Sequence, residues 1–275
     1  MKIVVTGASG FLGRALMDCL AQKGLPAIGV SRGTFPGILQ VERYEDTPTG
    51  DVLVHLAEAS DRAYAKTNVP HYEHQALAAL EALQAKGFSR VIYASSAVLY
   101  GDQGQSPRKV GDPVYETDPY TRLKLASERL VLGRNGVVAR LANLYGPGMA
   151  EANVLGTILK QLHKEGPVQI FDATPVRDFL WIEDAARGLA DMVAGQTAGI
   201  FNVGSGAGVS ILELATEVLR ATGQSGRPVE STHPGNRFSE LVLDITQTGA
   251  VFGWRPAVTL VEGIATLVKM KIAKD

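Results

Sequence analysis

The chain alternates between short apolar runs and longer stretches in which apolar residues recur at helical spacing. Residues 3–5 form an apolar, β-branched run, which predicts a buried strand. Helical spacing follows at once, and one helix face is shared by Leu12, Ala15, Leu16 and Leu20. Further strands are predicted at 26–30, 52–57, 90–94 and 137–140, with helices over 72–86 and from Pro119 onward. Strands that alternate with helices predict a parallel sheet covered by helices on both faces.

Residues suited to helix ends support these boundaries. Gly87 follows the helix over 72–86, as a C-terminal glycine should. Asp118 and Pro119 suit the N-cap and the first position of the next helix. Capping boxes are predicted later in the chain, with the pairs Ser210 and Glu213, and Thr259 and Glu262.

From about Glu151 the elements become shorter. The pattern predicts a helix over 154–162, strands at 168–171 and 179–181, a helix over 183–194 and a strand at 201–203. We therefore expect one domain over 1–150, and a smaller α/β lobe that occupies mainly 151–275 and is partly interleaved with the first.

The segment T-G-A-S-G-F-L-G directly follows the first strand and opens the first helix. Its glycines, Gly7, Gly10 and Gly13, are three residues apart. A strand, a glycine turn and a helix in this order are typical of a dinucleotide pyrophosphate site. Glycine lets the backbone approach the phosphates, and the helix start offers free N–H groups. The sequence therefore predicts a Rossmann-like, doubly wound sheet, with residues 1–150 as the dinucleotide-binding domain.

Composition narrows the functional classes. The 275 residues are 45% hydrophobic and 20% charged, the formal net charge is −1, and Cys19 is the only cysteine. An intrachain disulfide is impossible, so we expect a cytoplasmic protein. No apolar run is long enough to span a membrane, the first residues do not resemble a signal peptide, and no basic block indicates nucleic acid. His71 and His74 are one helical turn apart without further ligands nearby, so no metal site is expected.

The residues after the second strand bear on the choice of cofactor. An NAD site usually has Asp or Glu about 20 residues beyond the glycine turn, bound to the ribose 2′-hydroxyl. This chain has Ser31 and Arg32 instead. A guanidinium pairs well with a 2′-phosphate, so the sequence favours NADP, with NAD as the alternative.

Tyr120 and Lys124 are four residues apart and share a helix face. An ammonium about 4 Å from a phenol would favour the phenolate by roughly 4 kcal/mol at an effective dielectric of 20. Such a tyrosine can move a proton to or from a carbonyl oxygen beside a nicotinamide. The Ser96 hydroxyl, at the end of the strand before it, could bind the same oxygen.

Several motifs in this order resemble the extended short-chain dehydrogenases/reductases, the NAD(P)-dependent epimerase/dehydratase group that modifies nucleotide sugars. The resemblance extends over nearly the whole chain. The motifs that carry it are, in order, T-G-A-S-G-F-L-G, H-L-A, S-S-A-V-L-Y-G, Y-T-R-L-K, L-A-N-L-Y-G-P-G, R-D-F-L-W-I-E-D and F-N-V-G-S-G. The resemblance implies hydride transfer between a nicotinamide and a sugar carbon, most plausibly C4, by an epimerase or an oxidoreductase.

The resemblance also implies roles for individual residues. Tyr120 is the acid/base, Lys124 also binds the nicotinamide ribose, Ser96 is the catalytic serine, and Ser95 is structural. Substrate diphosphate contacts fall on Asn143, Arg177 and Arg237, the last with a less certain alignment. Cofactor contacts are expected from Gly7, Ser9, Gly10, Phe11, Leu12, Gly13, Ser31, Arg32, Leu56, Ala57, Ala59, Tyr120 and Lys124.

Departures from the family pattern bear on the reaction. The 4,6-dehydratases carry Asp-Glu after the serine or threonine, where this chain has Ala97 and Val98. Dehydration is therefore disfavoured. Tyr72 stands where the family often has Asn, which affects local packing of the site.

Other functions stay open at this point. The chain is shorter than many relatives, so a reductase of a non-sugar ketone or aldehyde is a second hypothesis. A non-catalytic NADP(H)-sensing protein is a third. A homodimer is expected from the resemblance, through the Tyr120 helix and the helix over 72–86.

Overall fold

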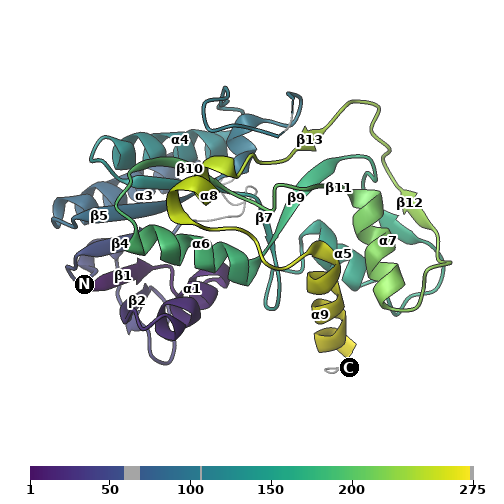
Figure 1. The fold of residues 1–275 in the computed structure, drawn as a ribbon, viewed down its shortest axis with the longest axis horizontal. Helices are drawn as coiled ribbons and strands as arrows, with labels where there is room; N and C mark the ends of the chain where they lie inside the picture. The colour runs from purple at the N-terminus through teal and green to yellow at the C-terminus, as the bar shows by residue number, and fades with distance from the viewer. Residues whose placement is uncertain (59–68, 106, 273–275) are drawn as a thin grey trace.

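A seven-stranded parallel sheet lies at the centre of the larger part of the molecule (Figure 1). The computed structural model describes residues 1–58, 69–105 and 107–272. The strands lie in the order β10-β6-β5-β4-β1-β2-β3. Their bounds are β1 Ile3–Thr6, β2 Ala27–Ser31, β3 Leu39–Gln40, β4 Val52–His55, β5 Arg90–Ser96, β6 Val137–Leu141 and β10 Gly199–Val203. This order and the parallel pairing confirm the predicted doubly wound fold.

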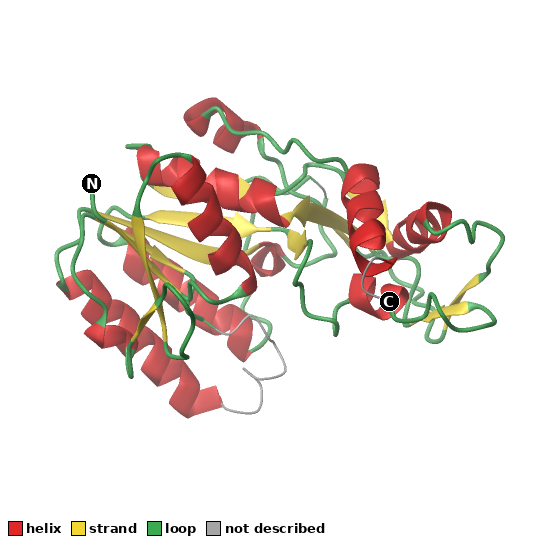
Figure 2. Cartoon of the chain, turned by 90° about the horizontal axis from the view of Figure 1, so that it is seen from below, coloured by secondary structure: helices red, strands yellow, loops and turns green. Residues whose placement is uncertain are grey.

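Both faces of this sheet are buried, which explains why its strands are apolar without strict alternation. Helices α1 (Phe11–Gln22) and α6 (Ile182–Ala194) pack together over one face, while α3 (Val69–Ala85) and α4 (Pro119–Leu132) pack over the other. Figure 2 shows helices on both sides of the sheet. Along β1, the side chains of Ile3 and Val5 join the first core, and that of Val4 joins the second.

A second, smaller group of elements lies beyond one end of the large sheet (Figure 1). Its four-stranded sheet consists of β7 Asn143–Tyr145, β9 Val176–Trp181, β11 Gly208–Ser210 and β13 Glu240–Leu241. Strands β8 Val168–Ile170 and β12 Val229–Ser231 form a separate parallel pair. Helices α5 Val154–Leu159, α7 Ile211–Ala221 and α9 Leu260–Ile272 cover a core of their own with residues from these strands.

The prediction of a strand limited to 179–181 was too short. Strand β9 begins at Val176 and contains Arg177 and Asp178. It pairs with β7, β11 and β13, and β11 and β13 pair with its first residues. These partners are distant in sequence, so a local pattern could not reveal them.

Segments from the second half of the chain return to the large sheet. Strand β10 pairs with β6, α6 packs on α1, and α8 (Thr246–Phe252) contacts β10. The Trp254 side chain is buried in the same core, and its indole N–H donates to the Asp184 carbonyl at 3.0 Å. The larger unit therefore contains segments from both sides of residue 150.

Most predicted helix ends agree with the structure. Asp118 caps α4 in a capping box with Thr121, and the Ser210–Glu213 and Thr259–Glu262 boxes both form. The helix predicted over 154–162 is shorter and ends at Leu159. Two single-turn 3₁₀ helices are also present, η1 (Tyr44–Asp46) and η2 (Ala97–Tyr100). Across the described ranges, no helix is long and apolar enough to cross a lipid bilayer.

Candidate active site

The carboxyl ends of β1, β4 and β5 meet at one edge of the large sheet. Strand β1 lies between β2 and β4. The strands β2 and β3 follow on one side of β1, and β4, β5 and β6 follow on the other side, so the strand order reverses at β1. Ligands of doubly wound sheets bind at such a reversal, outside the carboxyl ends of the strands. Most of the residues predicted for the cofactor and for proton transfer lie along this edge.

The glycine turn after β1 fits a pyrophosphate group. Gly7 has φ +73°, and a Cβ there would lie 2.9 Å from the Leu56 carbonyl group. At Gly13, a Cβ would collide with the Gly7 carbonyl oxygen, so α1 can pass this close to the turn only with glycine. Helix α1 has Gly10 at its N-cap, no side-chain cap and no acidic residue in its first turn. Its N–H groups and its dipole are therefore suited to hold phosphate oxygens.

The end of β2 lies beside this turn. The Ser31 hydroxyl is 2.8 Å from that of Ser9 and accepts the Gly33 N–H at 3.2 Å. Ser31 is buried, and its contact with Ser9 connects the end of β2 to the glycine turn. Arg32 is exposed, and its guanidinium carbon lies 5.5 Å from the centre of the Tyr44 ring. Its charge is accessible to an anion next to the turn.

Tyr120 and Lys124 are both buried at the sheet-facing side of α4, with exposed fractions of 8% and 6%. The Lys124 ammonium donates to the Ala94 carbonyl at 2.8 Å, near the carboxyl end of β5. It lies 5.8 Å from the centre of the Tyr120 ring. Helix α4 therefore directs both side chains to the edge where the glycine turn begins.

Glu58 is a partner of Lys124 that the sequence reasoning missed. Its carboxylate lies 3.0 Å from the ammonium, and the two side chains are 3% and 7% exposed. The same carboxylate accepts the Tyr93 hydroxyl at 2.6 Å and the Ser127 hydroxyl at 2.9 Å. Burial opposes ionisation of Glu58, yet Lys124, His55 and the Tyr93 hydroxyl together hold the pKa of this carboxyl below its ordinary value.

The same pair contributes to the ionisation of Lys124 and affects His55. Burial acts against the ammonium, but Glu58, Tyr120 and Tyr72 together outweigh burial and raise the pKa of Lys124. Burial lowers the pKa of His55 to about 4, with Glu58 opposing and Lys124 adding to the effect. His55 is therefore neutral near pH 7, and its Nδ1 lies 2.8 Å from the Thr6 hydroxyl. It packs parallel to the Tyr93 ring, as a core residue would.

The two serines at the end of β5 differ in their surroundings. The Ser95 hydroxyl is buried and donates to Glu128 at 2.5 Å, and Glu128 also forms a buried ion pair with Arg140. Ser96 is half-buried at the start of η2, where its hydroxyl oxygen accepts the Val98 N–H at 3.3 Å. Ser95 therefore has a structural partner, whereas the hydroxyl proton of Ser96 is not used in that bond.

Arg177 and Arg237 meet at Asp102, which follows η2. Arg177 donates to the Asp102 carboxylate at 3.1 Å and to the Ser239 hydroxyl at 2.8 Å. Ser239 donates to the same carboxylate at 2.5 Å, while Arg237 approaches it at 3.4 Å and is 59% exposed. Burial opposes ionisation of Asp102, but Ser239 and both arginines lower its pKa.

Two acids that follow Arg177 in the sequence have other partners. Asp178 accepts the Ser205 hydroxyl and nearby N–H groups, and Asp184 pairs with Arg187. The side chain of Asn143 donates to the Asp178 carbonyl at 3.1 Å, next to Arg177 on β9. The exposed amide of Asn143 therefore lies beside the strand that carries Arg177.

Phe171 is another residue that the sequence reasoning missed. It follows β8, its side chain is 71% exposed, and its ring stacks on His233 at a centroid distance of 4.6 Å. The sequence placed Phe171 in the strand predicted over 168–171, but β8 ends at Ile170, so the pattern gave no signal of this exposure. Among the predicted cofactor contacts, Ala59 lies outside the described residues.

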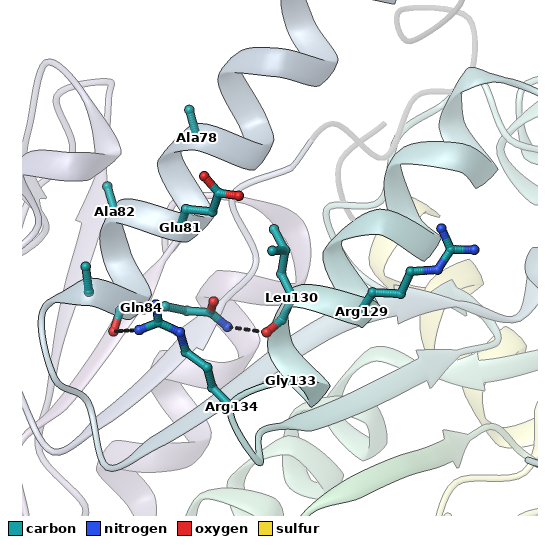
Figure 3. Close-up of a pocket in the computed structure, with 9 residues that line it drawn as sticks. Ala78, Glu81, Ala82, Gln84, Arg129, Leu130, Gly133 and Arg134 are labelled. Carbon is teal, nitrogen blue, oxygen red and sulfur yellow. Dashed lines mark hydrogen bonds between the residues drawn. The ribbon is translucent and has the colours of Figure 1, made fainter.

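A hollow of about 690 Å³ lies elsewhere, between the C-terminal halves of α3 and α4 (Figure 3). The Gln84 side chain donates to the Leu130 carbonyl at 3.1 Å, and Arg134 donates to the Gln84 carbonyl at 3.0 Å. None of the predicted site residues lines it. A metal centre is not indicated either, since residues 1–58, 69–105 and 107–272 contain no group of three or more His, Cys, Asp or Glu side chains placed to hold an ion.

Known proteins match this chain over nearly its whole length. The chain is 30% identical to UDP-glucose 4-epimerase of Mycolicibacterium smegmatis, with 98% of each chain covered. It is 26% identical to UDP-glucuronic acid decarboxylase 2 of Arabidopsis thaliana, over 98% of this chain and 68% of that one.

Solved structures have the same fold over their whole length. The structure of MoeE5 with UDP-glucuronic acid and NAD has a TM-score of 0.87 and 25% identity, with both chains fully covered. RMD of Pseudomonas aeruginosa, complexed with NADPH, has a TM-score of 0.84 and 23% identity, over 100% of this chain and 99% of that one. The model of the NAD dependent epimerase/dehydratase family matches residues 3–204. The chain described here therefore belongs to the NAD dependent epimerase/dehydratase family.

Proposed function

We propose that this protein is an NAD(P)-dependent epimerase or oxidoreductase of a nucleotide-activated sugar, which exchanges hydride at a sugar carbon, most plausibly C4. The observation that carries the proposal is the position of Tyr120 and Lys124 at the sheet edge that also carries the glycine turn. Relatives named as UDP-glucose 4-epimerase and UDP-glucuronic acid decarboxylase support a nucleotide sugar as substrate.

The chain's own residues would supply binding and proton transfer. A nicotinamide dinucleotide, when bound, supplies the acceptor or donor of hydride. Residues of the glycine turn would hold its pyrophosphate, and Lys124 would bind its nicotinamide ribose. Tyr120 would take the proton from the sugar hydroxyl or return it to the ketone oxygen, and Ser96 would donate a hydrogen bond to the same oxygen.

Arg177, Arg237 and Asn143 would bind the substrate diphosphate. Guanidinium groups suit phosphate oxygens because they donate several parallel hydrogen bonds. Phe171 offers an exposed aromatic face close to Asp172, whose charge acts on Arg177. Stacking of a nucleobase on such a face stabilises binding by about 1–3 kcal/mol. An exposed aromatic residue next to Asp172, which acts on Arg177, therefore supports a nucleoside diphosphate group rather than a plain ketone.

Dehydration is not part of this proposal. Ala97 is buried and Val98 is half-buried in η2, directly after Ser96. Neither side chain can donate or accept a proton, so these positions provide no acid/base pair for removal of water.

The experiment that tests the function is an assay with UDP-glucose and UDP-glucuronic acid, each with stoichiometric NAD or NADP. A net change in nicotinamide absorbance indicates oxidation or reduction, whereas inversion at C4 without net change indicates epimerisation. Tyr120→Phe should reduce turnover by about 100- to 10,000-fold and leave cofactor binding intact. Near-normal turnover in this variant would contradict the proposed mechanism, and no turnover of either sugar by the wild type would contradict the substrate class.

For the cofactor we propose NADP, because Arg32 is exposed beside the glycine turn. Arg32→Asp should shift the ratio of NADP to NAD affinity towards NAD by at least about tenfold, since a carboxylate repels a 2′-phosphate. Isothermal titration with both dinucleotides measures this ratio, with Arg43→Asp as the control for an exposed arginine of the same region. An unchanged ratio would contradict the NADP assignment.

We also propose a homodimer through α3 and α4. Small side chains line the hollow between these helices, including Ala78, Ala82 and Gly133, so a second copy could approach closely (Figure 3). Sedimentation of the wild type and of Ala82→Arg would test this contact. A wild type that sediments as a monomer would overturn it.

A further inference from the structure

Among residues 1–58, 69–105 and 107–272, the Glu58 carboxylate forms the ion pair with the Lys124 ammonium, and it lies inside the protein. The two groups are 3.0 Å apart and almost fully covered. At such burial, ion pairs are screened little by water or salt, so the charge of Glu58 acts at full strength on its surroundings. This separates the pair from the exposed ion pairs elsewhere on the chain, such as Arg129 with Glu116.

The carboxylate is held in place from three sides. Tyr93 of β5 and Ser127 of α4 donate one hydrogen bond each, and Lys124 adds the third contact. The two carboxylate oxygens are therefore both bonded, and Glu58 has a fixed position relative to α4. A mobile surface acid could not exert a constant effect on the site, whereas this one can.

The ammonium is held in place in the same way. An ammonium has three N–H donors. One points at the Ala94 carbonyl and a second at Glu58. Among the described residues only these two accept from it, so the third donor is left for Tyr120 and the ribose of the proposed cofactor, which would compete for it.

The charge of Lys124 is therefore balanced before it can act on Tyr120. An isolated ammonium at this distance from a phenol favours the phenolate, but a carboxylate on its other side opposes that effect. In the part of the chain that the structure describes, four other titratable groups act on the pair. They are His55 on β4, Tyr72 on α3, Tyr93 on β5 and Tyr120 on α4. Among these, His55 and the tyrosines are neutral near pH 7 in their ordinary states, so Glu58 provides the opposing charge.

We propose that Glu58 is a positioning residue for proton transfer: it fixes the Lys124 ammonium and offsets its charge, and so sets the pH at which Tyr120 gives up its proton. This inference rests on the proposed role of Tyr120. It assigns no direct contact of Glu58 with substrate.

Glu58→Gln tests the proposal because it keeps the shape and removes the charge. Turnover should depend on pH with a midpoint that is absent in Tyr120→Phe and therefore reports Tyr120. In Glu58→Gln this midpoint should move down by about one pH unit. The same shift should occur without substrate, in the ultraviolet absorbance of the phenolate, taken as the difference between proteins with and without Tyr120. Glu116→Gln is the matched control, because it removes the acid of an exposed ion pair with Arg129 of α4, and its midpoint should stay at the wild-type value. A folded Glu58→Gln protein with an unchanged midpoint overturns the proposal.

A doubly neutral variant keeps the test decisive if Glu58→Gln does not fold. In Glu58→Gln/Lys124→Gln both charges are removed, so the phenolate midpoint should stay within about half a pH unit of the wild type. Lys124→Gln alone should raise it. A rise in the double variant as large as in Lys124→Gln would mean that Glu58 has no effect and would overturn the proposal. The absorbance measurement needs no substrate, so it separates failure of this inference from failure of the proposed reaction.

Discussion

Two of the basic residues predicted to bind ligands, Lys124 and Arg177, each form an ion pair with an acid of the same chain. The two pairs differ in how far they are exposed. Lys124 and Glu58 are buried, with side chains 7% and 3% exposed. Arg177 and Asp102 are 23% and 25% exposed, and the neighbouring Arg237 is 59% exposed. A buried pair cannot exchange its partner without leaving a charge in the interior, whereas an accessible pair can exchange a carboxylate for another anion. The first pair is therefore suited to fix a charge, and the second to release arginines to a phosphate.

The largest effect is expected from breaking the buried pair. Lys124→Met would leave the Glu58 charge buried with only Tyr93 and Ser127 as partners. The free energy of unfolding should fall by about 3–5 kcal/mol, which corresponds to roughly 10 °C in melting temperature. Thermal denaturation measures the change. Lys124→Met/Glu58→Gln should recover most of the loss, and a single variant as stable as the wild type would remove the contrast between the two pairs.

A pH dependence of stability is expected from the same buried region. Folding lowers the pKa of His55 from 6.5 to about 4, so the unfolded chain binds its proton more readily than the folded one. The folded state should therefore lose stability as the pH falls from about 6.5 to 4, by roughly 3 kcal/mol from this residue. Urea unfolding at pH 7 and near pH 4.5 should show a smaller loss for His55→Asn than for the wild type. Equal losses in the two proteins would mean that His55 does not contribute.

The accessible pair should affect binding more than stability. Arg177→Ala should weaken UDP binding by roughly 30-fold, or about 2 kcal/mol, because two charged hydrogen-bond donors are removed. Its unfolding free energy should change less than that of Lys124→Met. Titration calorimetry with UDP measures the affinity, with the exposed and remote Arg220→Ala as control. Equal UDP affinity in the wild type and Arg177→Ala would show that this cluster does not bind the diphosphate.

The smallest effect is expected from the acid of the accessible pair. Asp102→Asn keeps a hydrogen-bond acceptor for Ser239 and removes the charge that competes with phosphate. UDP binding should tighten by about two- to fivefold, which is below 1 kcal/mol, as for other partly exposed ion pairs. Glu217→Gln on α7 serves as the control for loss of an acid that pairs with an arginine far from the site. Weaker UDP binding in Asp102→Asn would mean that Asp102 orients the arginines instead of competing with the ligand.

The sequence predicted the order of the elements because local patterns carry that information. The apolar run at 3–5, the glycine turn after it and the capping residues at Asp118 and Ser210 each depend only on neighbours along the chain. A parallel sheet with helices on both faces followed from the repetition of strand and helix, but the edge strands β3 and β10 were not assigned to it. Pairing between segments that are distant in sequence was harder to predict from local patterns, as the extent of β9 shows.

The candidate site could be predicted residue by residue, but its electrostatics could not. Spacing placed Tyr120 and Lys124 on one helix face, and motif order indicated Arg177 and Arg237. Nothing local indicated Glu58, which lies 66 positions before Lys124 in the printed sequence and meets it only because β4 and β5 pair and α4 packs over them. Asp102 meets Arg177 across 75 positions for the same kind of reason.

By itself, the sequence determined the main strands and helices of the large sheet and the position of the glycine turn, and it indicated which side chains could move a proton. Only the tertiary structure decided how each charge is balanced. A side chain's type and its spacing are local properties, but its partner, its burial and the dielectric around it depend on segments that folding brings together. The Lys124 ammonium is the example: the sequence supplied the cation, and the fold supplied the buried Glu58 carboxylate beside it.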